Sequence, residues 1–128
     1  MKDFSLLILR LVFGGLMFIN HGLPKFDKLD KTPIRFPDPL GVGSEISLYL
    51  TLFSEGLCSV LLVLGLFSRW VSLPLLFTMG IAAFYIHLSD PLDTKEASLT
   101  YLAAYLIILA FGPGKFSLDK LIRPRAKF

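Results

Sequence analysis

The chain has 128 residues, of which 54% are hydrophobic and 18% are charged, and its mean hydropathy is +0.67. Soluble domains are about 45 to 50% apolar and about 25% charged, so this composition excludes an ordinary water-soluble domain and indicates a protein embedded in lipid. The net charge of +3 does not indicate nucleic-acid binding, because the charged residues gather at 24–45, 89–96 and 115–128 and leave long apolar blocks between them.

The first apolar segment, 4–23, has the length that a transmembrane helix needs. It is too long for the apolar core of a secretory signal and ends without a small-residue cleavage site, so we expect it to be retained. The segment carries Arg10, Asn20 and His21. A charged side chain near the bilayer centre costs roughly 2.5 to 3.5 kcal/mol on insertion scales, so Arg10 is expected to face other helices and not lipid.

A proline-rich stretch, 24–45, follows and is predicted to form a long loop and not a helix. Three further apolar segments come after it, at 46–67, 70–88 and 97–111. Only Ser68 and Arg69 separate the second segment from the third, so these two are expected to be antiparallel neighbours. Gly112-Pro113-Gly114 ends the fourth segment, because helix-breaking residues are usually placed just past a helix end.

The four segments predict an all-α fold, a transmembrane four-helix bundle that forms a single domain over residues 1–128. Lys and Arg near the ends of the segments set the orientation, because they are enriched on the cytoplasmic side. One side holds Lys2, Arg69, Lys115, Lys120, Arg123, Arg125 and Lys127. We therefore expect both termini to be cytoplasmic and the loop 24–45 to lie outside, with the basic C-terminal tail against the anionic headgroups of the lipid bilayer.

Each predicted span carries an ionisable group, and such groups usually face the bundle interior and pair with one another. They are Arg10 and His21 in the first span, Glu55 in the second, His87 in the third and Glu96 at the start of the fourth. Helical spacing places each of them on a face with small or apolar residues. The four faces are Arg10, Gly14, Met17 and His21; Thr51, Glu55, Cys58 and Ser59; Phe77, Gly80, Phe84 and His87; and Glu96, Thr100, Ala103 and Ile107.

The depth of these groups along their helices allows a pair between Arg10 and Glu55. With a rise of about 1.5 Å per residue, Glu55 lies roughly 13 Å and Arg10 roughly 20 Å from the outer end, a gap that a long guanidinium can largely bridge. The pair could be structural, fixing helix packing, or it could line a polar pocket that opens toward the outer face. Arg10 could also extend to the inner interface, and His21 and His87 could be ordinary interface residues.

The predicted outer ends of the helices carry a candidate set of metal ligands. His21, His87 and Glu96 come from three helices and together resemble a three-ligand set. No two of them have the close helical spacing of a zinc motif, so we predict no metal site. Cys58 is the only cysteine, which rules out an intrachain disulfide, and it is expected to be a small buried hydrophobic residue.

Taken in order, five stretches resemble the DoxX family of small four-helix integral membrane proteins. These are LLILRLVFGGLMFINHGLPKF, FPDPLGVGS, FSEGLCSVLLVLGLFSRW, IAAFYIHLSDP and KEASLTYLAAYLIILAFGPGKFSLD. The most specific parts are Arg10, His21-Gly22 with Lys25, Glu55, Gly65-Leu66-Phe67 with Arg69, His87, Glu96, Gly112-Pro113-Gly114 and Ser117-Leu118-Asp119. The resemblance implies a multi-pass protein of the bacterial cytoplasmic (inner) membrane.

The resemblance also implies a function, a subunit of a membrane oxidoreductase with a polar pocket for a quinone head group or a small anion. Its candidate catalytic residues are Arg10, His21, Glu55, His87 and Glu96. The sequence has neither a cysteine set for an iron–sulfur cluster nor a dinucleotide glycine motif, so we expect no intrinsic cofactor and a partner redox protein that carries the electrons.

A non-enzymatic function is the alternative. The same pocket could hold a lipid or another hydrophobic ligand, or the outer loop with Phe26 and Phe36 could dock a secreted partner for assembly or transport. A homo-oligomer and a purely structural subunit both remain open. A fold by itself does not select among these functions.

Overall fold

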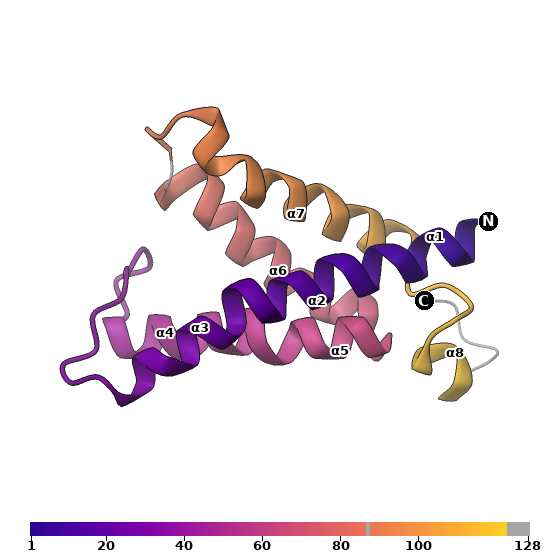
Figure 1. The fold of residues 1–128 in the computed structure, drawn as a ribbon, viewed down its shortest axis with the longest axis horizontal. Coiled ribbons are helices and arrows are strands. Elements are labelled where there is room, and N and C mark those ends of the chain that lie inside the picture. The colour runs from indigo at the N-terminus through magenta and orange to yellow at the C-terminus, as the bar shows by residue number, and fades with distance from the viewer. Residues whose placement is uncertain (87, 123–128) are drawn as a thin grey trace.

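The structure is a computed structural model that describes residues 1–86 and 88–122, with the backbone alone at Thr94. Over these residues the chain is all-helical and contains no strand. The first helical run, Lys2–Asp30, contains α1 (Lys2–Leu9), α2 (Gly15–Met17) and α3 (Leu23–Phe26). The second, Ser44–Leu64, contains α4 (Ser44–Leu52) and α5 (Ser59–Leu64). The third, Ser68–Ile86, begins with α6 (Ser68–Ile81), and α7 (Leu92–Phe111) and the short α8 (Leu118–Ile122) follow it (Figure 1).

Wide π-helical turns interrupt three of these runs. They lie at Arg10–Gly14, Phe18–Gly22, Phe53–Cys58 and Ala82–Ile86. Such turns are rare and are frequently found at functional sites. Three of the predicted site residues, Arg10, His21 and Glu55, lie in them.

The first run does not end near residue 23, where the sequence suggested a loop, but continues through Pro24 to Asp30. Proline normally breaks a helix because its ring meets the carbonyl four residues back. Here the wide turn Phe18–Gly22 lies directly before α3, and its altered hydrogen-bond spacing accommodates the proline. The extension matters because it carries Lys25 into the bundle.

A short turn joins α5 to α6. Gly65 ends α5 in the left-handed region with φ 74°, and Phe67 follows with φ 53°. The turn is closed by bonds from Gly65 N to Leu62 O (3.0 Å) and from Leu66 N to Leu61 O (2.9 Å), which satisfy carbonyl groups at the helix end. The chain therefore reverses direction within a few residues.

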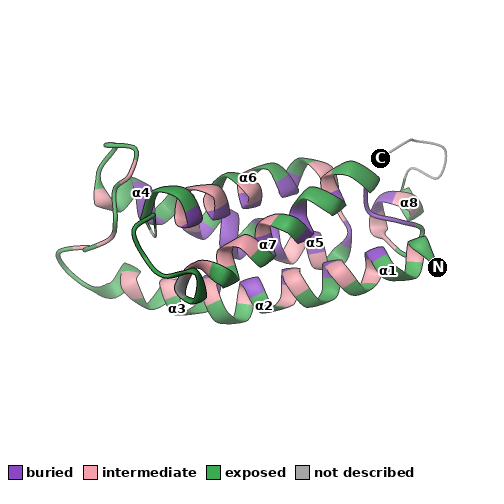
Figure 2. Cartoon of the chain, turned by 90° about the horizontal axis from the view of Figure 1, so that it is seen from above, coloured by how far each residue is buried: buried purple, intermediate pink, exposed green. Residues whose placement is uncertain are grey.

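The interior is an apolar core to which every long helical run contributes. Its buried members are Met17, Cys58, Leu62, Val71, Leu75, Met79, Tyr101, Tyr105 and Ile108. Figure 2 shows the buried residues as patches along the inward faces of the helices, with exposed residues on the outer faces. Many exposed residues are large and apolar, among them Phe4, Leu11, Ile19, Leu57 and Phe77. A surface of this kind fits a lipid environment and not water.

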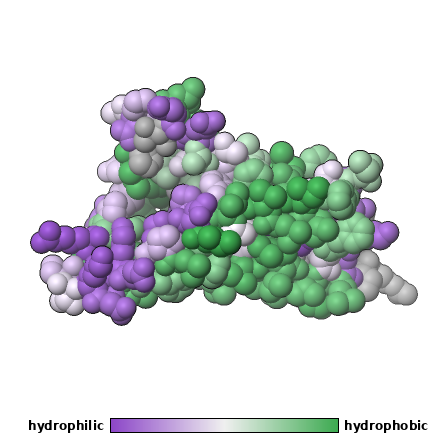
Figure 3. Space-filling model, viewed as in Figure 1, coloured by the Kyte–Doolittle hydropathy of each residue, from purple (hydrophilic) through white to green (hydrophobic). Residues whose placement is uncertain are grey.

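By length and composition, Lys2–Asp30, Ser44–Leu64 and Ser68–Ile86 can each cross a membrane. Figure 3 shows an apolar band over the helices, with hydrophilic residues gathered at the end that carries the loop after α3. The face in view is hollowed at that end, between the loop and the turn that links α6 to α7. The N-terminus and α8 lie at the opposite end (Figure 1). The chain is therefore built as a membrane protein with two distinct polar ends.

One predicted helix face is wrong. The sequence placed Phe77, Gly80, Phe84 and His87 toward the interior, but Phe77 and Phe84 are 58% and 59% exposed. The buried face of this run instead carries Leu75, Met79 and Ala83. The predicted inward face was chosen from the position of His87. The face that packs is instead formed by aliphatic and small residues, which let helices approach closely in lipid. His87 itself lies outside the described residues.

Candidate functional site

The structure pairs Glu55 with a residue of the first run. Glu55 lies in the wide turn Phe53–Cys58 and is 4% exposed. Its Oε2 is 2.5 Å from Nζ of Lys25, and the same ammonium donates to the carbonyl of His21 at 3.2 Å. Lys25 and His21 are four residues apart, so both lie on one face of the extended first run. An ion pair therefore joins the C-terminal part of the first helical run to the middle of the second.

Close backbone contact holds this pair in place. A Cβ at Gly22 would lie 2.7 Å from the carbonyl oxygen of Glu55, so only glycine permits this approach of the two helices. Ser59 Oγ donates to the carbonyls of Glu55 at 2.5 Å and Gly56 at 2.8 Å. These bonds occupy carbonyl groups inside the wide turn. The His21-Gly22 dipeptide thus combines a polar side chain with the contact that positions Glu55.

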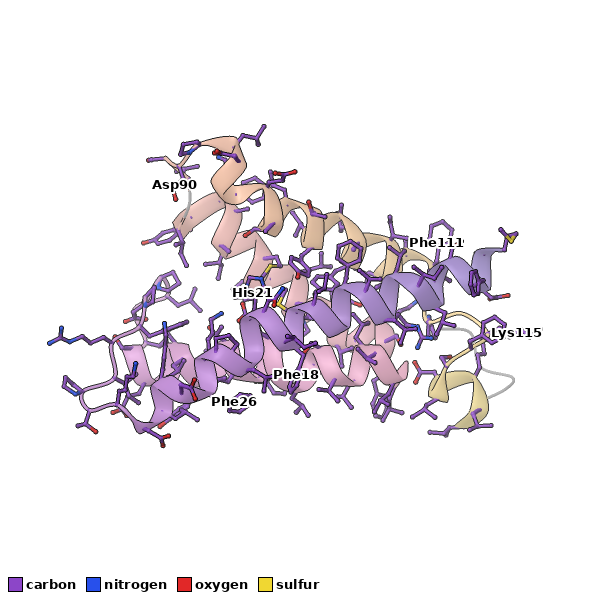
Figure 4. The ribbon with its side chains drawn as sticks, viewed as in Figure 1. Phe18, His21, Phe26, Asp90, Phe111 and Lys115 are labelled. Carbon is purple, nitrogen blue, oxygen red and sulfur yellow. The ribbon has the colours of Figure 1, made fainter. Side chains whose placement is uncertain are left out.

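Aromatic side chains of α7 lie against His21. The His21 ring meets Tyr101 edge to face with 5.4 Å between centroids, and Tyr101 stacks on Tyr105 at 6.0 Å. Phe13 contacts Tyr101 at 5.6 Å, and its carbonyl accepts the Tyr105 hydroxyl at 3.0 Å. Figure 4 shows His21 on the side of the first run that faces α6 and α7.

We call Lys25, His21, Glu55, Tyr101 and Tyr105 the Glu55 cluster. The ion pair of Lys25 with Glu55, the bond from Lys25 to the His21 carbonyl and the ring contacts of His21, Tyr101 and Tyr105 connect its members. The side chain of Glu55 is 5% exposed, whereas that of Lys25 is 19% exposed. Lys25 is therefore the more accessible partner of the ion pair. The cluster can donate hydrogen bonds, accept them and exchange protons.

Arg10 does not belong to this cluster, and the predicted pair with Glu55 is wrong. The guanidinium is fully buried and donates from Nη2 to the carbonyl of Phe116. Among the described residues its Nε and Nη1 have no hydrogen-bond partner, and the nearby charge that acts on it is that of Asp119. A Cβ at Gly65 would collide with this guanidinium. Arg10 holds the segment after α7 against the first helix.

Asp119 is a structural residue that sequence reasoning missed. Its carboxylate is 3% exposed and accepts the amides of Phe67 at 2.7 Å and Ser68 at 3.0 Å, which caps the start of α6. Its own amide donates to the carbonyl of Gly65 at 2.9 Å. The family pattern includes Ser117-Leu118-Asp119 and Gly65-Leu66-Phe67 as separate parts, and the sequence did not link them, because they lie far apart in the chain.

Glu96 lies on the predicted face of its helix, but that face does not meet Glu55. Glu96 is exposed and lines an open groove between α7 and the first run, together with Thr100, Ala103, Ile107 and Phe13. Phe13, which lines the groove, also contacts Tyr101. Neither Glu55 nor His21 lines this groove.

No group of three His, Cys, Asp or Glu residues that could hold a metal ion occurs in the described part of the chain. His21 instead contacts Tyr101, and Glu96 lines the groove beside α7. Cys58 is buried in the core, as the sequence predicts for a small hydrophobic residue.

The chain is similar to other membrane proteins. The family model described as DoxX matches residues 5–88, a region that includes Arg10, His21 and Glu55 and ends before Glu96 and Asp119. An uncharacterized protein of Haemophilus influenzae is 31% identical, over 93% of this chain and 83% of its own. An uncharacterized membrane protein of Mycobacterium tuberculosis is 28% identical, over 95% of this chain and 83% of its own. No solved structure matches the chain significantly.

Proposed function

The chain belongs to the DoxX family of membrane proteins, and on that premise we propose that it is the membrane subunit of an oxidoreductase whose Glu55 cluster binds the head group of a quinone. It lies in the bacterial inner membrane with α7 as a fourth span and both termini in the cytoplasm. This orientation is supported by the basic residues near the end that carries the N-terminus and α8, among them Lys2, Arg69 and Lys115.

The observation that carries the proposal is the meeting of a buried carboxylate, an ammonium and an imidazole where the first and second helical runs touch, with the ring of Tyr101 against the imidazole. Reduction of a quinone to a quinol takes up two electrons and two protons, so its site needs hydrogen-bond donors for the carbonyl oxygens and groups that deliver protons. Lys25 and His21 supply donors, and Glu55 supplies and accepts protons. A small oxyanion would use the same two donors.

Electrons must come from a partner protein. The chain has one cysteine, which cannot ligate an iron–sulfur cluster. The outer loop offers a formed surface for docking: Lys28 Nζ lies 5.1 Å from the centroid of the Phe36 ring, and Ser44 Oγ donates to the carbonyl of Phe36 at 2.9 Å. We propose that this loop, which follows the helical run that carries Lys25, contacts the redox partner.

The direct test is the quinone content of protein purified with its native lipids. Wild-type protein is expected to retain quinone, and Glu55→Gln is expected to retain about tenfold less, because the amide can neither take up a proton nor pair with Lys25. Glu45→Gln is the matched control, since Glu45 is exposed in the first turn of α4. Equal quinone in all three proteins, or none in the wild type, would contradict the proposal.

One observation favours a second candidate, the binding of a lipid or another hydrophobic ligand without redox chemistry. The groove beside α7 is open, mainly apolar and floored by small residues such as Ala103 and Ala104. Ala103→Phe would fill part of this groove. If bound lipid is lost in Ala103→Phe and kept in Glu55→Gln, the hydrophobic-ligand function is favoured; the opposite pattern favours the quinone site.

A further inference from the structure

A second groove lies at the end of the molecule that carries the N-terminus and α8. It has a volume of about 940 Å³ and is enclosed by the start of α1, the start of α6 and the segment after α7. Its charged lining residues are Lys2, Arg69, Lys115, Lys120 and Asp3. Four cations thus face a single carboxylate. Nothing in the proposed oxidoreductase function uses this concentration of positive charge.

The groove is formed by contacts within the chain itself. The carboxylate of Asp3 accepts the amide of Lys115 at 3.0 Å, which ties the start of α1 to the segment after α7. Arg69 donates to the carbonyl of Ala110 at 3.3 Å, so its guanidinium is fixed beside the end of α7. Lys115 Nζ lies 5.7 Å from the centroid of the Phe116 ring. Two of the four cations are therefore positioned before any ligand arrives.

The remaining wall of the groove is apolar. Phe111, Pro113 and Leu121 line it, and Phe111 and Leu121 are also exposed on the surface. Figure 4 places Phe111 and Lys115 together at this end of the bundle, where the apolar helices stop. A soluble anion would use the charges but not this wall. A molecule with an anionic head and hydrocarbon chains would use both.

We propose that this groove binds the phosphodiester head group of an anionic phospholipid, with the acyl chains lying along the apolar wall. The charge complementarity favours anionic over zwitterionic lipid, because each Lys or Arg near a membrane surface strengthens binding to anionic lipid about fivefold. The site lies at the other end of the molecule from the Glu55 cluster (Figure 1). Lipid binding in this groove needs only a membrane environment, so it does not depend on whether the protein binds quinone.

The test measures lipid retention by native mass spectrometry of the full chain in detergent, with phosphatidylglycerol and phosphatidylcholine as probes. Wild-type protein is expected to prefer phosphatidylglycerol. Lys2→Gln combined with Lys115→Gln is expected to weaken phosphatidylglycerol binding about thirtyfold, because two cations are lost. Both side chains are exposed, so the variant should fold, which its helical circular dichroism checks.

The matched control combines Lys31→Gln with Arg35→Gln, which removes the same charge from the loop at the opposite end. It is expected to bind phosphatidylglycerol as the wild type does. Equal binding of the two lipids by the wild type, or an equal loss in the control, would overturn the proposal. Full displacement of the lipid by excess inorganic phosphate would also overturn it, because the groove would then be a site for free phosphate.

Discussion

At the scale of single residues, the two charges that interrupt the apolar sequence have separate partners. Arg10 binds the carbonyl of Phe116 toward the end of the bundle that carries the N-terminus and α8, and Glu55 binds Lys25 nearer the other end. A buried charge is tolerated in a membrane protein when such a partner is present. Two separate contacts, Arg10 with Phe116 and Glu55 with Lys25, therefore replace the single Arg10–Glu55 pair that the sequence allowed.

Arg10 is expected to stabilise the folded chain without affecting ligand binding at Glu55. Arg10→Ala should lower the free energy of unfolding by about 1.5 to 3 kcal/mol, since the carbonyl of Phe116 loses a charged donor. Thermal unfolding in detergent measures this change. Arg35→Ala, an exposed substitution in the loop, should leave the transition unchanged. An Arg10→Ala protein as stable as the wild type would contradict the assignment.

The Lys25–Glu55 pair is expected to show strong coupling. Lys25→Met strands a buried carboxylate and should destabilise the protein by about 3 kcal/mol, the lower end of the range for breaking a buried pair, because Lys25 is partly exposed. Adding Glu55→Gln should recover part of this loss. A double-mutant cycle on unfolding free energies measures the coupling. Additive effects of the two substitutions would show that the residues do not form a pair.

At the scale of helices, the site depends on how closely the first and second runs approach. Gly22→Ala places a methyl group against the carbonyl of Glu55, so we expect a loss of about 1 to 3 kcal/mol. Gly15→Ala is the matched control, because a Cβ there meets nothing within 4 Å and alanine favours the helix. Thermal unfolding of both variants tests this contrast. Equal stability of the two would argue against a close helix contact at Gly22.

The start of α4 is expected to respond to pH. Hydrogen bonds from Ser47 and from the amides of Gly43 and Val42 lower the pKa of Asp38 below its ordinary value. The ionised Asp38 carboxylate therefore stabilises the start of α4 at neutral pH, and this stabilisation is lost as the pH falls through the lowered pKa of Asp38. The protection of the Val42 and Gly43 amides from hydrogen exchange, taken relative to an unstructured peptide at the same pH, should fall in that range. In Asp38→Asn the protection of these amides should be lower at neutral pH and should not change with pH in this range; unchanged protection at neutral pH in that variant would contradict the role of the Asp38 carboxylate.

Sequence patterns predicted much at this scale, but not where helices bend or end. The inward face of the first run through Arg10, Gly14 and Met17 follows directly from helical spacing, and all three are buried. The continuation past Pro24 was missed, because a wide turn that accommodates proline has no clear sequence signal. The partner Lys25 was missed with it, since it was assigned to a loop.

At the scale of the whole molecule, the all-helical membrane fold could be predicted from composition and the family resemblance, whereas the pairing of distant segments could not. The contact of Asp119 with Phe67 and Ser68 brings together the C-terminal segment and the turn before α6. A single sequence carries no signal for such a contact. The same is true of the groove at Glu96, which opens because α7 packs mainly on α6 and only lightly on the first run.

The central claim is that the Glu55 cluster is a ligand site and not merely a structural contact. Redox-induced infrared difference spectroscopy of the protein in native lipids tests it most directly, because reduction of a bound quinone must perturb a neighbouring carboxyl group. We predict a carboxyl band that appears on quinone reduction in the wild type and in Glu45→Gln and is absent in Glu55→Gln. A quinone signal with the same carboxyl band in Glu55→Gln, or no quinone signal in the wild type, would contradict the account.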